Sequence, residues 1–285
     1  MTTISSMWLG DTTNIDYSYI NELGEIVGGS IRPKFVVTGK VDPVEQVVVD
    51  FSAIKKAIKK LIDDPERGFD HKMWWIDGMS RGTIEYVNGM VYVKTPRVEI
   101  SGPENIVRRV TSERELEDYL TAELSKQYPG VDIEIECYAT YTFDVMPQMN
   151  TNTHSFRYVH GLRESTSWGC QNIAHGHLSY LVAEVDGDTL AADMLLSKIA
   201  ANLDNTVFIW ENNNVSPRKI EYTCSRGEMK MEVLNQKTVV LGTESTVEHL
   251  VDYVAQEWGD ELAKVNIKKL YVSEGLSKGA CTVIE

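Results

Sequence analysis

In each half of the chain the spacing of apolar positions changes from the period of a strand to that of a helix. KFVVTGKV (34–41) and QVVVDF (46–51) are rich in β-branched residues, which predicts two strands. In FSAIKKAIKKLIDD (51–64) the apolar positions recur at helical spacing and the lysines fall on another face, which predicts an amphipathic helix. Its predicted apolar face consists of Ile54, Ile58, Leu61 and Ile62.

A hairpin and a second helix follow in the same half. Asn88-Gly89 between two short apolar runs predicts the hairpin turn. The run 112–126 predicts a helix with Ser112 as N-cap and Glu115 three residues later, which together would form a capping box. The segment 131–143 then predicts a closing strand.

The second half repeats this order of elements. Strand, helix, hairpin, helix and two closing strands are predicted over 177–185, 193–203, 218–233, 245–258, 266–275 and 280–285. Short motifs recur as well: Ile84-Glu85-Tyr86 returns as 220–222, Asp118-Tyr119 as 252–253, and Asp70 as Asp204, at offsets of 134 to 136 residues (204 − 70, 220 − 84). The polar stretch 146–153 divides the halves, so we expect two α+β domains, 1–146 and 147–285. Each would be an antiparallel four-stranded sheet with two helices on one face and an inserted hairpin.

Composition narrows the function classes. The 285 residues carry a formal net charge of −14, which disfavours binding of nucleic acid through a broad basic face. No basic leader precedes an apolar run and no stretch approaches the length of a membrane span, so we expect a cytoplasmic protein. The four cysteines contain no CxxC pair, which favours reduced thiols over disulfides or a thiolate zinc site.

The segment CQNIAHGH (170–177) carries the clearest chemistry. His175 and His177 are two residues apart on a predicted strand, so both imidazoles should point to one side. His160 lies 15 residues upstream (175 − 160), a suitable distance for a neighbouring strand. Three histidines without a fourth protein ligand are typical of a catalytic zinc site, although two of them could instead be ordinary surface or core residues. Cys170 close by favours the metal site over that alternative.

These residues resemble the family of 6-pyruvoyltetrahydropterin and 6-carboxytetrahydropterin synthases. The resemblance covers FxxxHxL (156–162), Cys170 and His175-Gly176-His177, the stretch 36–75 with Asp70-His71, and the segment 268–285 with Glu274. It implies two tandem tunnelling-fold (T-fold) repeats, each of the ββααββ type, and a homo-oligomer in which the sheets form barrels.

The sequence departs from the family by dividing one set of site residues between the halves. Val27-Gly28-Gly29 stands where the first half should carry its histidines, and Asp204-Asn205 replaces the Asp-His pair in the second half. Each half therefore keeps what the other lacks, and we expect one composite site where the halves meet, within one chain or between two.

The resemblance implies a zinc-dependent lyase that acts on 7,8-dihydroneopterin triphosphate. Zn²⁺ held by the three histidines would bind the side-chain hydroxyls of the substrate, Cys170 would act as base, His71 with Asp70 as proton relay, and Glu274 as pterin anchor. The expected product is 6-carboxy-5,6,7,8-tetrahydropterin, on a route to 7-deazaguanines such as queuosine. Formation of 6-pyruvoyltetrahydropterin, or a non-catalytic protein that binds zinc and pterin, are the alternatives.

Three further features stay open. Arg157 and Arg163 flank the histidine segment and could meet the phosphates or lie in solvent. The adjacent Trp74 and Trp75 indicate packing or an interface rather than a pterin stack. A nitrile reductase of the same fold is a distant possibility, because its glutamate-lysine motif is not found here.

Overall fold

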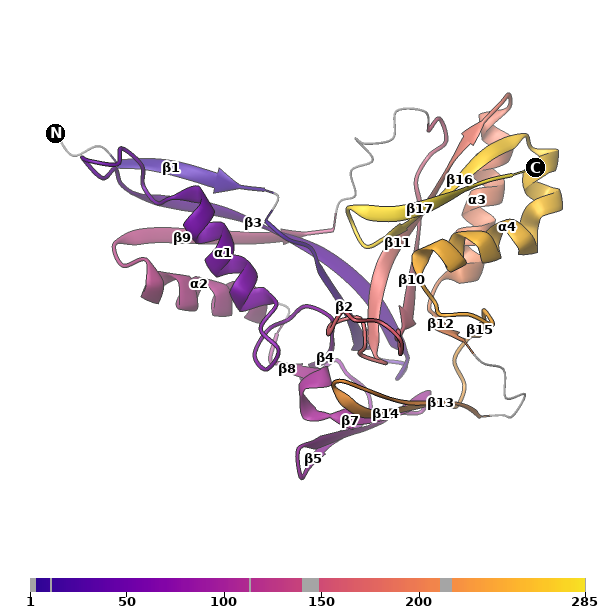
Figure 1. Ribbon diagram of the computed structural model, residues 1–285, viewed down its shortest axis with the longest axis horizontal. Coiled ribbons are helices and arrows are strands. Elements are labelled where there is room, and N and C mark those ends of the chain that lie inside the picture. Colours follow the sequence, from indigo (N-terminus) through magenta and orange to yellow (C-terminus); the bar gives the residue numbers. More distant parts are fainter. Residues whose placement is uncertain (1–3, 11, 113, 140–148, 211–216, 285) are drawn as a thin grey trace.

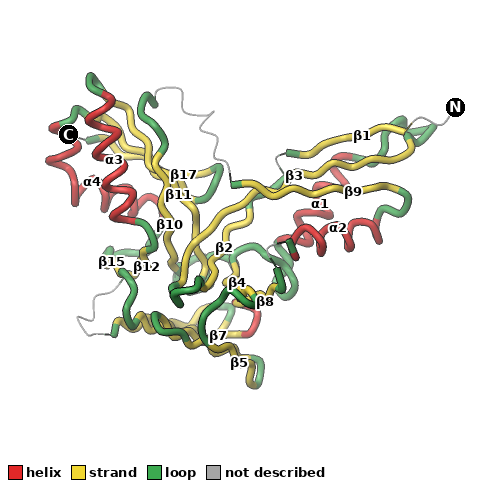
Figure 2. The backbone as a smooth tube through the Cα atoms, turned by 180° about the vertical axis from the view of Figure 1, so that it is seen from behind, coloured by secondary structure: helices red, strands yellow, loops and turns green. Residues whose placement is uncertain are grey.

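The computed structural model describes residues 4–10, 12–112, 114–139, 149–210 and 217–284. They form two units, each a sheet covered by two helices, and a third sheet that joins the units (Figure 1, Figure 2). The predicted boundary at Met146 lies outside the described residues. No helix in the described ranges is long and apolar enough to cross a membrane.

The first unit contains a long, strongly bent strand that three other strands share. Its sheet has the order β1-β3-β2-β4-β8, with β9 also paired to β3, and helices α1 and α2 cover it (Figure 1). The strand bounds are Ile4–Leu9 (β1), Ile15–Ile20 (β2), Ile26–Lys40 (β3), Lys72–Ile76 (β4), Val107–Val110 (β8) and Val131–Tyr138 (β9). The helices span Phe51–Ile62 (α1) and Glu115–Gln127 (α2).

The second unit holds a sheet of order β15-β12-β10-β11-β16-β17, covered by α3 and α4. The strands span His154–His160 (β10), His175–Val185 (β11), Thr206–Ile209 (β12), Thr238–Val240 (β15), Ile267–Glu274 (β16) and Lys278–Val283 (β17). The helices span Thr189–Leu203 (α3) and Val247–Lys264 (α4). The prediction of an antiparallel four-stranded sheet in each half is wrong in strand number and in direction. Each of these sheets has six strands among the described residues, because the short strands on either side of each hairpin add parallel pairs at one edge, β2-β4-β8 in the first and β10-β12-β15 in the second.

The hairpins of the two halves merge into one sheet, which the sequence pattern did not predict. Its order is β13-β14-β7-β6-β5, with the junction between β14 and β7. The strands span Thr83–Val87 (β5), Met90–Lys94 (β6), Val98–Pro103 (β7), Arg218–Cys224 (β13) and Gly227–Val233 (β14), and a short 3-10 turn, Glu104–Ile106, follows β7.

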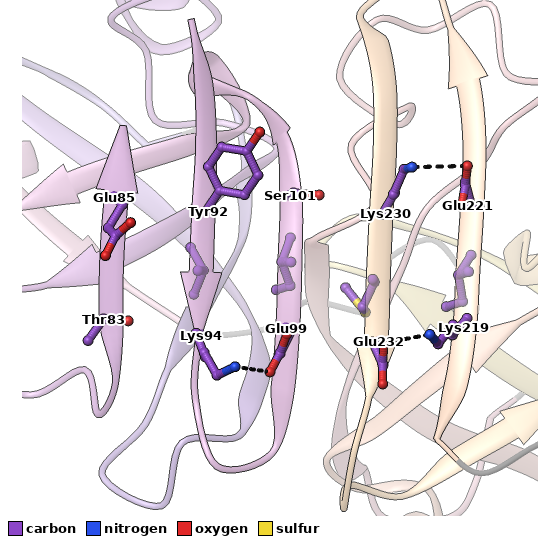
Figure 3. A pocket seen from close by; sticks show the side chains of 14 residues that line it. Thr83, Glu85, Tyr92, Lys94, Glu99, Ser101, Lys219, Glu221, Lys230 and Glu232 are labelled. Carbon is purple, nitrogen blue, oxygen red and sulfur yellow. Dashed lines mark ion pairs between the residues drawn. The ribbon is translucent and has the colours of Figure 1, made fainter. Parts of the chain in front are cut away.

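The two faces of this shared sheet differ in polarity. Its inner face contributes residues such as Ile100 and Met231 to a core that also includes Trp75, Val159 and Ile173, so both halves bury apolar surface together. Its outer face carries cross-strand ion pairs over a shallow hollow of about 520 Å³ (Figure 3). The pairs are Lys94 with Glu99, Lys230 with Glu221, and Lys219 with Glu232.

Two local predictions are wrong. The run 46–51 is not a strand: Asp42 accepts the amides of Val44 and Glu45 in a turn, and Asp50 then caps α1 by accepting from Ala53. Side-chain bonds of this kind compete with strand pairing.

Ser112 does not cap the second helix either. Helix α2 begins at Glu115 with Arg114 at the N-cap, and the Glu115 carboxylate accepts from Thr111 N and Oγ1 at 2.5 and 2.9 Å. Glu115 therefore accepts hydrogen bonds at the start of the helix, as predicted, but its partner is Thr111, one residue before the predicted N-cap Ser112.

The helical and hairpin predictions otherwise agree with the structure. Ile54, Ile58 and Ile62 are fully buried along α1, and Leu61 packs at the edge of the same core. Asn88 and Gly89 connect β5 to β6 and both have positive φ, as this turn requires.

The two units cross at a pair of glycines. A Cβ added at Gly28 in β3 would lie 2.1 Å from Tyr158 O and 2.6 Å from His177 N, and one added at Gly176 in β11 would lie 2.7 Å from Gly28 Cα. Only glycine allows backbones to approach this closely. The glycine between the two histidines is therefore required by the contact between the halves.

Candidate metal centre and active site

Three histidine rings meet at the end of the β10-β11 hairpin. His160 lies directly opposite His175 in the antiparallel register, and His177 follows two residues later on the same strand. All three are at most 1% exposed, and one ring nitrogen from each lies within 4.8 Å of the others. The expectation that His160 sits on the neighbouring strand is thereby confirmed.

Backbone carbonyls orient two of the three rings. His160 Nδ1 donates to Ser245 O at 2.7 Å, and His175 Nδ1 donates to Asn172 O at 2.7 Å. A carbonyl only accepts, so in both neutral rings the lone pair is on Nε2. Nε2 of His175 is buried without a partner among the described residues, and Nε2 of His160 lies 3.0 Å from Nε2 of His177.

Burial keeps the imidazoles of His160 and His175 uncharged. It lowers the pKa of His160 to about 3, with the neighbouring His177 acting in the same direction, and it lowers the pKa of His175 well below its usual value. Neutral, buried and convergent nitrogens fit a zinc ion, whose preferred ligands include imidazole and whose catalytic sites use three protein ligands. The donor set thus matches the metal that the sequence predicts.

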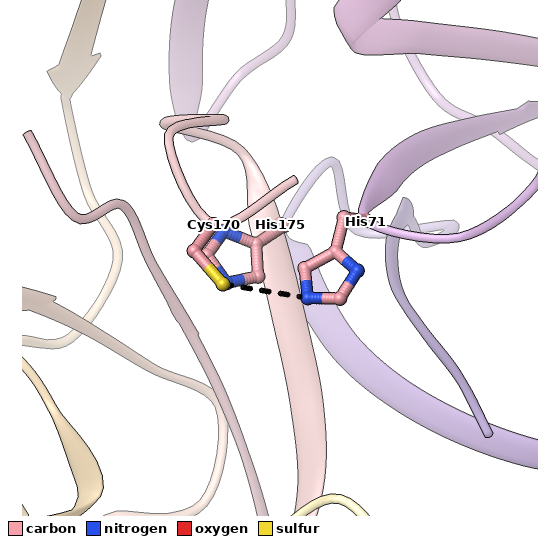
Figure 4. Close-up of side chains that lie close together, drawn as sticks. All are labelled: His71, Cys170 and His175. Carbon is pink, nitrogen blue, oxygen red and sulfur yellow. Dashed lines mark hydrogen bonds between the residues drawn. The ribbon is translucent and has the colours of Figure 1, made fainter. Parts of the chain in front are cut away.

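Cys170 and His71 come together although they are 99 residues apart in sequence. Cys170 Sγ lies 3.6 Å from His71 Nε2, and the His71 and His175 rings are 5.2 Å apart between centroids (Figure 4). Asp70 Oδ2 lies 2.5 Å from His71 Nδ1, which places the carboxylate behind the ring. One chain therefore brings the thiol, the imidazole and the carboxylate into a row beside the three histidines.

The pKa shifts within this row have opposite directions. Burial alone would lower the pKa of His71, but the charge and hydrogen bond of Asp70 and the bond with Cys170 raise it well above its usual value. Burial alone would raise the pKa of the Cys170 thiol, but the hydrogen bond and charge of His71 outweigh it and lower the pKa. Both shifts favour a thiolate beside an imidazolium over a neutral thiol–imidazole pair.

Backbone geometry holds His71 in place. Its φ is +53°, a left-handed conformation that is uncommon outside glycine. His71 N donates to Asp16 O at 2.6 Å, and Asn172 Nδ2 donates to His71 O at 2.9 Å. The main-chain carbonyl of Asn172 also accepts a hydrogen bond from His175 Nδ1. The buried Asn172 therefore connects the thiol–imidazole pair, through its side chain, to the histidine cluster, through its main chain.

Glu274 lies at the rim of the cluster. Its Oε1 is 3.8 Å from His177 Nε2, and its Oε2 is 2.8 Å from Lys278 Nζ. Burial raises the pKa of this carboxyl, but His177 and Lys278 overcome that effect and lower it to about 2. The carboxylate is therefore ionised and directed toward the site.

The two basic residues considered for phosphate binding have other contacts. Arg163 pairs with Glu244 at 2.7 Å and lies over the Trp210 ring, and Arg157 lines a different cavity. Trp74 and Trp75 are 5% and 6% exposed in the cores, as the packing interpretation requires.

The corresponding place in the first half is filled by aromatic residues. The Tyr19–Val27 pair stands where the second half has the His160–His175 pair. The Tyr17–Gly29 pair stands where it has Tyr158–His177. The Tyr17 ring covers Gly29 and stacks on Trp74 at 3.9 Å. A cavity of about 590 Å³ adjoins it, lined by Gly28, Gly29, Tyr17, Tyr19, Trp74 and Arg157 among others.

Sequence reasoning missed several residues that contact the predicted ones. Asp16, Asn172 and Ser245 each lie next to a histidine of the site. Asp16 and Ser245 are far from the motif in sequence, and no local pattern marks them. Asn172 lies inside the quoted segment, and an asparagine three residues before a predicted ligand is the one available signal.

Comparisons with known proteins give limited similarity. No protein-family model matches the chain, and no curated protein sequence matches it significantly. Among solved structures, 6-pyruvoyltetrahydropterin synthase from Plasmodium vivax matches with 15% identity over 47% of this chain and 91% of that one, at a TM-score of 0.39. The enzyme from Plasmodium falciparum matches with 17% identity over 47% and 91%, at a TM-score of 0.38. The functional argument therefore rests on the residues of the site.

Proposed function

We propose that the protein is a zinc-dependent lyase that acts on 7,8-dihydroneopterin triphosphate. The single observation that carries the proposal is the 3.6 Å approach of Cys170 Sγ to His71 Nε2 beside three convergent, buried histidines. A thiol and an imidazole beside a cluster of three histidines are more than packing needs, because each buried polar nitrogen costs stability unless it is satisfied. The residues are those of the resemblance to the tetrahydropterin synthases.

The halves are interpreted as two T-fold repeats, 1–146 and 147–285, that share one site. Asp16 N donates to Asp70 Oδ1 at 2.8 Å, and Arg157 N donates to Asp204 Oδ1 at 2.7 Å in the other half. The residues after these aspartates, His71 and Asn205, have φ of +53° and +55°. The same local device with different side chains supports duplication followed by loss of complementary parts.

In this proposal the protein residues move protons while the pterin is held. Zn²⁺ bound by His160, His175 and His177 would act as a Lewis acid that makes hydrogens on carbon next to its hydroxyl ligands more acidic. The Cys170 thiolate takes such a proton, and the His71 imidazolium returns one, with Asp70 holding the ring. Triphosphate leaves by elimination.

Glu274 would anchor the pterin ring by accepting hydrogen bonds from its amino and ring N–H groups. Lys278 already occupies one oxygen of this carboxylate, so the ring would bind through Oε1 or displace the lysine. A Glu274→Gln variant should therefore raise KM for the pterin more than it lowers kcat.

We favour 6-carboxy-5,6,7,8-tetrahydropterin as product, whose formation would consume one water and would release the two outer side-chain carbons as acetaldehyde in addition to triphosphate. Formation of 6-pyruvoyltetrahydropterin, which needs only loss of triphosphate and proton shifts, is the alternative. A non-catalytic protein that binds zinc and pterin is the second functional class. The thiolate–imidazolium pair favours the enzyme, because a binding protein has no use for a thiol of lowered pKa.

The test is turnover of the zinc-loaded protein with dihydroneopterin triphosphate, followed by triphosphate release and mass-resolved chromatography of the pterins. Cys170→Ala and His71→Ala should each abolish turnover, whereas Cys281→Ala, which removes an exposed thiol, should not change it. Because the pair lies within one chain, a mixture of the two inactive variants should stay inactive. Absence of turnover in the wild type would refute the enzyme and leave the binding protein.

The resemblance also implies a homo-oligomer, which we retain as part of the proposal. Sedimentation analysis of the wild type tests it, and a monomer that turns over substrate would show that assembly is not needed for the site.

A further inference from the structure

A carboxylate from the first half contacts the third histidine of the metal centre. Asp16 in β2 is 3% exposed, and its Oδ1 lies 3.3 Å from His177 Nδ1. Unlike Nδ1 of His160 and of His175, Nδ1 of His177 is buried without a hydrogen-bond partner among the described residues, and the Asp16 carboxylate lies 3.3 Å from it. Asp16 is therefore the group available to orient the His177 ring.

Neighbouring residues hold the Asp16 carboxylate in place. Ser30 Oγ donates to Asp16 Oδ1 at 2.5 Å, and the same hydroxyl accepts the amide of Leu178, the residue after His177. Gly275, with φ of +66°, leaves room for the carboxylate, because a Cβ there would lie 2.5 Å from Asp16 Oδ1. The Asp16 side chain is thus restricted by Ser30, by Gly275 and by His177.

The backbone of the same residue holds the proton relay. Asp16 N donates to Asp70 Oδ1 at 2.8 Å, and Asp16 O accepts from His71 N at 2.6 Å. One residue therefore contacts the relay through its main chain and a metal ligand through its side chain. In the second half Arg157 occupies the corresponding place: its main chain makes the equivalent contact with Asp204, but its side chain offers no carboxylate.

We propose that Asp16 is a positioning residue of the metal centre, which fixes the orientation of His177 and increases its affinity for Zn²⁺. A carboxylate that accepts from the distal nitrogen of a zinc-bound imidazole fixes the ring and makes it a stronger ligand, and loss of such a partner typically costs about 10-fold to 100-fold in metal affinity. The inference rests on the proposed function only through the identity of the metal.

The test is the zinc affinity of Asp16→Asn, measured by competition with a chromophoric chelator in the absence of substrate. The variant keeps the volume and both main-chain contacts, so the relay stays in place. We expect zinc affinity to fall about 10-fold to 100-fold, while the melting temperature of the zinc-free protein stays constant or rises. Substitution with Co²⁺ should shift the visible absorption bands of the variant, because the geometry around the ion changes.

A matched control is available in another histidine–carboxylate pair. His154 Nε2 lies 3.4 Å from Asp193 Oδ1 at the opposite end of β10 from His160, and Asp193 also accepts from Asn152. Asp193→Asn should lower stability through these contacts and leave zinc affinity unchanged. Ser30→Ala, which removes the donor to Asp16, should lower zinc affinity in the same direction as Asp16→Asn but by less.

The outcomes separate the two proposals. Equal zinc affinity in the wild type and Asp16→Asn overturns the role of Asp16 and leaves the lyase proposal intact. A wild type that binds zinc tightly, loses it in Asp16→Asn, but converts no pterin supports the role of Asp16 and refutes the lyase. A wild type that binds no zinc overturns both.

Discussion

Substitution of Gly28 by alanine tests whether the crossing of the two units determines both stability and the metal centre. The added methyl group would lie 2.1 Å from Tyr158 O and 2.6 Å from both N and O of His177. All three atoms are backbone, so no flexible side chain can move aside, and the strands themselves must separate. Overpacking of this kind costs about 1–3 kcal/mol, and we expect the upper end of that range.

The assay is urea denaturation of the zinc-free protein, with zinc affinity measured in parallel. Because His177 carries two of the three clashing atoms, Gly28→Ala should weaken zinc binding as well as folding. Gly259→Ala in α4 is the matched control: no atom lies within 4 Å of its added methyl group, and it should be neutral or stabilising by up to about 1 kcal/mol. A loss below about 1 kcal/mol for Gly28→Ala, with zinc affinity intact, would refute the close crossing.

Three further predictions concern titration and metal removal. The lowered pKa of Cys170 predicts that iodoacetamide labels this thiol at pH values where an ordinary thiol is protonated, and that His71→Ala moves the midpoint of the labelling rate to higher pH. Burial raises the pKa of Cys137 to about 12, so Cys137 should stay unlabelled in the folded protein. Peptide mass spectrometry after labelling measures each outcome. Burial lowers the pKa of Lys72 from 10.5 to about 8, so between these pH values the folded protein binds fewer protons than the unfolded chain. The free energy of unfolding should therefore rise with pH in that interval. Urea titrations measure this rise, and Lys72→Met should abolish it. Zinc at 100 times its Kd should stabilise the wild type by about 2.7 kcal/mol, and chelation or His160→Ala should remove this increment in calorimetry.

Much of the fold could be predicted because amphipathic periodicity is local. The helical face of α1 and the position of His160 on the strand next to His175 could be predicted from spacing, whereas their direct pairing in register could not. The run QVVVDF was misread because β-branched composition does not reveal that Asp42 and Asp50 offer side-chain acceptors to nearby amides. Propensity fails where a short polar side chain satisfies the backbone first.

The fusion of the two hairpins into one sheet could not be predicted for a different reason. A hairpin pattern defines which residues pair within it, but it does not define which strand covers the open edge. Only the three-dimensional arrangement brings Val98 of β7 opposite Val233 of β14. Edge pairing between distant segments is therefore a property of the assembled halves.

The site divides along the same line. The three histidines of the metal centre and Cys170 lie within 18 residues (160 to 177), and residue types that bind metals are recognisable in sequence. The groups that orient them, Asp16 and Ser245, come from strands and loops 161 and 85 residues away from their partners (177 − 16, 245 − 160). Carboxylates and carbonyls of this kind are common everywhere in a chain, so their role is visible only when the fold brings them close.

The division of the site between the halves has a physical consequence for its assembly. Asn172 donates to His71 O and Ile106 O in the first half, while its own carbonyl accepts from His175 in the second. All of these groups are buried or nearly so, and a buried polar group left unpaired costs about 1–3 kcal/mol. Incorrect docking that left these groups buried without their partners would carry this cost for each of them, and separation of the halves would expose the shared core to water. Correct docking of the halves and correct geometry of the site are thus stabilised by the same contacts.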